Sequence, residues 1–112
     1  MQPTSPEKLR ALSNEEIGAM VQRYLDDERS DPAYQTIFGN IYFEVDTPHI
    51  VKSDNHARVP VRPSTEPRRV HYMYGLLADI NVEIVDKELI NIYLAPGDPL
   101  ESSEEARELA VA

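Results

Sequence analysis

Residues 70–85 read VHYMYGLLADINVEIV, and this stretch decides the expected fold. Every second position from Val70 to Ile84 carries an apolar or aromatic side chain, while the positions between them become polar toward the end. Alternation of this kind is typical of a β-strand with one buried face. Because the stretch is long for a single strand, we expect a bend or a bulge near Gly75.

Further strands are predicted on both sides of this stretch. Residues 41–46 alternate in the same way, residues 34–38 are also strand-like, and residues 89–94 return after a hairpin connection at 86–88. Residues 57–67 contain three prolines, which cannot donate to a sheet ladder, so we expect an edge or a loop there.

One amphipathic helix is predicted before these strands. Ser13 followed by Glu16 has the spacing of a capping box. The apolar residues behind it recur at the spacing of one buried helix face: Ile17, Met20, Val21, Tyr24 and Leu25. Pro32 disfavours helical geometry at the preceding residue, so the helix is expected to end near Arg29. We therefore predict an α+β fold, with this N-terminal helix packed on an antiparallel sheet of four or five strands.

The length of 112 residues is that of one domain. We assign residues 1–11 to a flexible N-terminal arm, 12–100 to a single α+β domain, and 101–112 to an acidic tail or short helix. The absence of cysteine excludes disulfides, cysteine-based metal sites and thiol nucleophiles. No stretch approaches the roughly 20 apolar residues of a membrane span, and residues 1–10 lack the apolar centre of a signal peptide. We expect a cytoplasmic protein with no membrane association.

Charge is distributed unevenly along the chain. The net charge of −9 makes nucleic acid an unlikely partner, because binding phosphates requires clustered cations. Residues 47–78 are the exception, with five basic residues against two acidic ones. Guanidinium groups bind phosphate and carboxylate in a bidentate manner, so these cations are the predicted binding residues for an anion or an acidic partner: Lys52, Arg58, Arg62, Arg68 and Arg69. The abundance of carboxylates favours the alternative, in which they form weak ion pairs with the protein's own acidic residues.

Histidine and aspartate are the other candidate functional residues. The weak candidates for a metal site are His49, His56, His71, Asp46 and Asp54. Their spacings arise often by chance, and histidines beside turn-forming aspartates are the commoner interpretation. In a small-molecule-binding or metal-assisted hydrolytic domain, a histidine would join Asp46 or Asp79 in a pocket between helix and sheet. Asp79 is informative because burial in a cavity would perturb its ionisation.

The sequence contains no glycine-rich phosphate loop, serine elbow or His-Glu-x-x-His pair, so it predicts no catalytic residue and no cofactor. We expect a small non-catalytic protein-interaction or regulatory module that self-associates as a homodimer through an open sheet edge. The arginine- and proline-rich segment would bind the partner. Tyr42 and Tyr93 are expected on wetter faces, where they would line a groove or a subunit contact. The small-molecule-binding or hydrolytic domain is the alternative.

Overall fold

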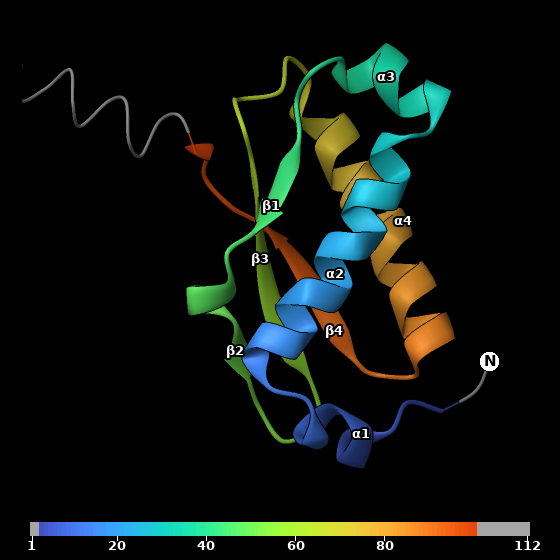
Figure 1. The fold of residues 1–112 in the computed structure, drawn as a ribbon, viewed down its shortest axis with the longest axis vertical. Helices are drawn as coiled ribbons and strands as arrows, with labels where there is room; N and C mark the ends of the chain where they lie inside the picture. Colours follow the sequence, from blue (N-terminus) through green and yellow to red (C-terminus); the bar gives the residue numbers. More distant parts are fainter. Residues whose placement is uncertain (1–2, 101–112) are drawn as a thin grey trace, which may run out of the picture.

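The computed structural model describes residues 3–100, and the α+β class is confirmed within them. The elements follow the chain in the order α1 (Pro6–Ala11), α2 (Asn14–Arg29), α3 (Pro32–Phe38), β1 (Phe43–Val45), η1 (Thr47–His49, a 3-10 turn), β2 (Val51–Lys52), β3 (Ala57–Pro63), α4 (Val70–Glu88) and β4 (Ile92–Pro96). The two long helices, α2 and α4, touch each other and lie on the same side of the sheet (Figure 1). The hydrophobic core fills the space between these helices and the sheet.

The sheet is mixed rather than antiparallel, which corrects the expected topology. The central strand β3 pairs antiparallel with both β1 and β2, and parallel with β4. The parallel pair exists because α4 carries the chain from the end of β3 back to the level where β3 began, as a crossover connection must. The prediction of a single helix is also wrong, because residues 3–100 contain four α-helices.

The expected long strand is the helix α4, so this prediction is wrong. The buried residues of α4 recur at helical spacing: Met73, Leu77, Ile80 and Ile84. The alternation misled because α4 is apolar on more than its buried side, with Tyr74 and Val82 being 53% and 68% exposed. Residues 86–88, expected to be a hairpin, form the last turn of α4, and the helix ends where Leu89 takes a left-handed conformation (φ 58°).

Two further segments differ from their expected structure. Residues 34–38 lie in α3, whose N-terminus is capped by the Asp31 carboxylate accepting from the backbone N–H of Ala33 at 2.9 Å. Pro32 occupies the first helical position, where its fixed φ suits a helix and its missing N–H costs nothing. Residues 1–11, expected to be a flexible arm, include the helix α1, which buries Leu9 completely.

The proline-rich segment expected at an edge or in a loop contributes the central strand β3. Its two prolines fit because the missing N–H groups fall where no neighbouring strand needs a donor. The backbone of Pro60 points toward β1, but the residue opposite it is Asp46, which lies just after the end of β1. The Pro60 carbonyl accepts from the N–H of Asp46 at 2.9 Å. Pro63 ends β3, past Val61, which is opposite the last residue of β4.

The predicted helix is confirmed as α2. Both bonds of the capping box are present: the Glu16 N–H donates to the Ser13 hydroxyl at 3.1 Å, and the Ser13 N–H donates to the Glu16 carboxylate at 2.9 Å. The expected apolar stripe faces the core, with Ile17 and Val21 fully buried. Among residues 3–100, no helix combines the length and the apolar character that crossing a membrane requires.

The outer edge of β1 is closed by an amide side chain from α2. The Gln22 side-chain amide donates to the carbonyl of Phe43, and its oxygen accepts from the N–H of Val45, both at 2.9 Å. One side chain thus makes the two hydrogen bonds that a neighbouring strand would make.

The outer edge of β4 is closed in the same way by α4. The Asn81 amide donates to the carbonyl of Ile92 at 3.1 Å and accepts from the N–H of Leu94 at 2.7 Å. We call Gln22 and Asn81 the amide clamps. Because open edges are what pair with other strands, the amide clamps disfavour the expected self-association through a sheet edge.

Candidate functional site

The structure separates the five predicted cationic residues. The Lys52 ammonium donates to backbone carbonyls at the end of α1, including that of Leu12, and so acts as a C-terminal cap. The Arg62 guanidinium donates to the carbonyls of Asp98 (2.8 Å) and Pro99 (3.2 Å), which holds the chain after β4 against β3. These two cations have local structural roles in the fold.

Arg68 and Arg69 remain together on the surface, while Arg58 is exposed on β3. The two adjacent arginines line a hollow of about 540 Å³, which we call the arginine cleft. The cleft is formed by α3, the turn that follows it, and the segment leading into α4. Its lining residues are Gln35, Thr36, Ile37, Phe38, Gly39, Ile41, Pro67, Arg68, Arg69 and Tyr72.

The floor of the arginine cleft is held by an aromatic cluster. The Tyr34 ring packs against Phe38 and Phe43, with ring centroids 4.9 Å and 6.2 Å apart, and its hydroxyl donates to the carbonyl of Ile41. Burial raises the pKa of Tyr34 to about 12. Gly39 ends α3 with φ 59° and ψ −119°, a conformation that side chains with a Cβ strongly disfavour. The cleft wall therefore has a defined shape.

The cationic charge of the cleft is not neutralised within residues 3–100. The ion pairs formed there join other residues, and no carboxylate in this part of the chain pairs with Arg68 or Arg69. The Arg69 guanidinium carbon lies 6.0 Å from the centroid of the Tyr72 ring, at the range of a cation–π contact. The predicted ion pairs with the protein's own carboxylates could also involve the acidic segment 101–112, which lies outside the described residues.

The histidines and aspartates proposed as weak metal ligands do not gather at one place. His49 pairs with Asp46 on the surface, with 2.9 Å between Nδ1 and the carboxylate oxygen. His56 and Asp54 lie in the exposed turn between β2 and β3, and His71 lies in α4. Across residues 3–100, no three histidine or carboxylate groups are placed to hold a metal ion.

Asp79 does not lie in a buried cavity. It is exposed and lines a small hollow of about 250 Å³ between α2, α3 and α4, together with Glu28 and His71. Burial raises the pKa of Glu28, and the nearby carboxylates, first that of Asp31, raise it further. His71 and Asp79, one of the pairs expected for the hydrolytic alternative, thus line the same hollow, but within residues 3–100 no hydrogen bond joins the His71 ring to Asp79 or Glu28, and the ring packs on Tyr72 instead.

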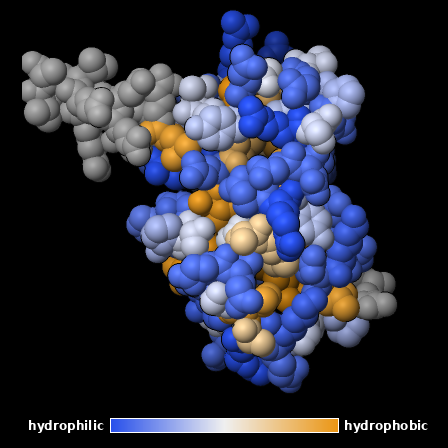
Figure 2. Space-filling view, in the orientation of Figure 1, coloured by the Kyte–Doolittle hydropathy of each residue, from blue (hydrophilic) through white to orange (hydrophobic). Residues whose placement is uncertain are grey.

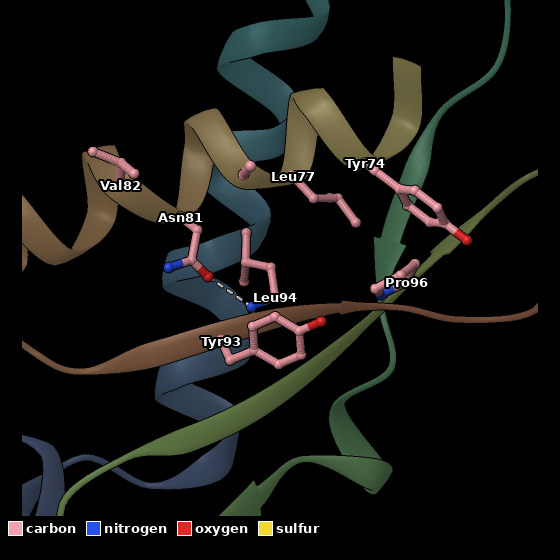
Figure 3. Close-up of a pocket in the computed structure, with 8 residues that line it drawn as sticks. Tyr74, Leu77, Asn81, Val82, Tyr93, Leu94 and Pro96 are labelled. Carbon is pink, nitrogen blue, oxygen red and sulfur yellow. Dashed lines mark hydrogen bonds between the residues drawn. The ribbon is translucent and has the colours of Figure 1, made fainter. Parts of the chain in front are cut away.

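A second surface feature lies between α4 and β4. This groove of about 460 Å³, here called the α4–β4 groove, has no charged side chain in its lining: Tyr74, Leu77, Ala78, Asn81, Val82, Tyr93, Leu94 and Pro96. Figure 3 shows Leu77 and Leu94 between helix and strand, with Tyr74 and Tyr93 at the rim. By contrast, Figure 2 shows the face bearing α2 as largely hydrophilic with scattered apolar patches.

Tyr93 lines this groove, as expected for one of the two wetter tyrosines. Tyr42 does not; its exposed ring lies 5.6 Å from the guanidinium carbon of Arg29. The groove could not be found while residues 70–85 were assigned to a strand. The signal that would have found it is the four-residue spacing of Val70, Tyr74, Ala78 and Val82, which places them in one row on a helix.

Comparison of the chain with protein-family models, with curated proteins and with solved structures found no match. The arginine cleft and the α4–β4 groove are therefore the features from which a function is proposed.

Proposed function

We propose that the protein is a non-catalytic interaction module that binds an acidic segment of a partner protein in the arginine cleft. One observation carries the proposal: Arg68 and Arg69, adjacent at a hollow of about 540 Å³, pair with no carboxylate among residues 3–100. Most of the protein's other charge is acidic, so this spot is where an acidic partner meets attraction rather than repulsion.

The apolar part of the cleft indicates what the segment looks like. Ile37 and Tyr72 are 49% and 40% exposed at the rim, and Phe38 is buried beneath them. A segment with carboxylates beside one apolar side chain would contact both the guanidinium groups and this apolar wall. Carboxylates bind guanidinium groups through charge-assisted hydrogen bonds, which are stronger than neutral ones. Binding should weaken as salt concentration rises, because both arginines are exposed.

The test compares two double charge reversals as baits in affinity capture from the native cell. Arg68→Glu with Arg69→Glu changes the cleft. Arg23→Glu with Arg58→Glu changes the net charge by the same amount at two exposed arginines outside the cleft. We expect the wild type and the control to capture the same partner. The cleft variant should bind it at least about tenfold more weakly, since charged hydrogen bonds contribute about 1.5–3 kcal/mol.

The captured partner is then titrated against all three proteins, whose folding is checked by circular dichroism. A partner that binds the cleft variant as well as it binds the wild type contradicts the proposal. A partner whose affinity falls equally for the two double variants also contradicts the proposal, because net charge alone then explains binding.

A further inference from the structure

We propose that the α4–β4 groove receives α4 of a second copy of this chain, in an antiparallel two-fold contact. This interface goes beyond the proposed function, because it uses a different surface from the arginine cleft. Its starting point is the row of residues on α4 that face away from the core at intervals of four: Val70, Tyr74, Ala78 and Val82, all of them exposed.

A strand cannot occupy the groove by extending the sheet. The Asn81 amide already bonds the carbonyl of Ile92 and the N–H of Leu94 on the outer edge of β4. Pro96, the last residue of β4, has no N–H to offer. The occupant must therefore present side chains rather than a backbone edge, as a helix does.

The row on α4 is itself such an occupant, because an antiparallel two-fold contact centred on Ala78 sets the residues of the row against one another. In an antiparallel pair with the two-fold axis at Ala78, each Tyr74 comes opposite the partner's Val82. The helix thus supplies both an apolar ridge and one wall of the groove that receives it, which is what a self-complementary two-fold interface requires. Alanine at the crossing point lets the two helices approach closely.

Charge favours the same arrangement. The residues lining the groove carry no charge, although the whole chain has a net charge of −9, so two copies can meet at this lining without setting like charges against each other there. Asp86 is the next residue in the row, and the antiparallel pairing places it opposite the first turn of the partner's α4. That turn contains no acidic residue, and its N-cap, Arg69, makes no side-chain cap bond. A carboxylate is favourable there because the N-terminus of a helix is electropositive.

The absence of cysteine from the chain makes a direct cross-linking test available. Ala78→Cys places two thiols at the two-fold axis, within disulfide reach for helices packed at alanine-sized spacing. Ala33→Cys, an exposed alanine on α3, is the control. Under mild oxidation, we expect the full-length Ala78→Cys protein to become a covalent dimer and the Ala33→Cys protein to remain largely monomeric on a denaturing gel. Equal cross-linking of the two overturns the interface.

A second pair of variants tests the interface without cross-linking. Val82→Glu places a carboxylate in the groove, while Val51→Glu makes the same change at a valine of similar exposure (62% against 68%) on β2. By light scattering across a concentration series, we expect dimers for wild type and Val51→Glu, and monomers for Val82→Glu with an unchanged circular dichroism spectrum.

A wild-type protein that stays monomeric at the highest concentration, or a dimer that persists in Val82→Glu, overturns the proposal. The two proposals fail separately, because Val82 is not part of the arginine cleft.

Discussion

Asn81→Ala removes the amide clamp on β4 and is predicted to destabilise the protein measurably. The wild-type side chain makes two hydrogen bonds to β4, each contributing about 1 kcal/mol net, so their loss costs about 2 kcal/mol. Alanine returns about 0.6 kcal/mol through its better helix propensity, which leaves a loss of about 1.4 kcal/mol. With an unfolding entropy of about 0.2 kcal/mol/K for a chain of this size, the melting temperature should fall by about 7 °C.

The matched control is Asn91→Ala, at an exposed asparagine just before β4. The Asn91 backbone carbonyl accepts from the N–H of Ala57, and the substitution keeps that bond. We expect its melting temperature to stay within about 2 °C of the wild type, as for most surface substitutions. Amide hydrogen exchange gives a local measurement, because the N–H of Leu94 should exchange faster in Asn81→Ala and unchanged in Asn91→Ala.

Two results would refute this reasoning. One is a melting temperature of Asn81→Ala that matches that of Asn91→Ala. The other is a protected N–H at Leu94 in the absence of the amide, because the clamp is then not what satisfies the edge.

The remaining predictions concern the floor and wall of the arginine cleft and one glycine of α4. Gly39→Ala should cost about 1–3 kcal/mol in chemical denaturation, because φ is 59° and nothing lies near the added Cβ, so the loss is backbone strain. Gly75→Ala in α4, which also has open space around the Cβ, should instead stabilise by about 0.5–1 kcal/mol. Tyr34 has a folded-state pKa raised to about 12, so its contribution is fully present below pH 10 and is lost as pH rises through 12. Between pH 10 and pH 12, the free energy of unfolding of Tyr34→Phe should fall by about 2 kcal/mol less than that of the wild type. An identical decrease in the two proteins over this pH range would contradict the assignment.

The parts of the fold that are specified locally were predictable from the sequence. The start of α2 depends on Ser13 and Glu16, three residues apart, and its buried face depends on a stripe within two turns. The inward positions of β1 and β4 were also predictable, since Phe43, Val45 and Leu94 are buried as the alternation indicates. Such features need no knowledge of what lies across the core.

The parts that depend on tertiary context were not predictable in the same way. In α4, aromatic and β-branched residues favour a strand by propensity, yet the helix wins because one side of it packs on the sheet and on α2. Length was the available cue, since 19 residues suit a helix far better than a strand. For β3, the prolines argued against a central strand, and only the positions at which β1 and β4 end make them acceptable there.

The arginine cleft was predictable in part. Composition indicated the basic segment, and Arg68 and Arg69 do line a hollow. Lys52 and Arg62 could not be set apart from them, because the carbonyls that they bond come from α1 and from the chain after β4, far away in sequence. The α4–β4 groove was missed because residues 70–85 were assigned to a strand, and the four-residue spacing of Val70, Tyr74, Ala78 and Val82 places them in one row only on a helix.

The prolines of β3 also bear on how the protein avoids misfolded states. If β3 paired with β1 two residues out of register, every apolar side chain would still lie on its correct face. Burial of apolar side chains therefore does not distinguish this misfolded pairing from the native one. In one direction, the slip brings Pro60 opposite Glu44, whose native partner is Arg62. The Glu44 carbonyl would then face a ring that has no hydrogen to give. In that direction, the proline removes a hydrogen bond inside β1, at Glu44, whereas the native alignment places it opposite Asp46, just beyond the end of β1, and so the proline disfavours this misalignment within the strand.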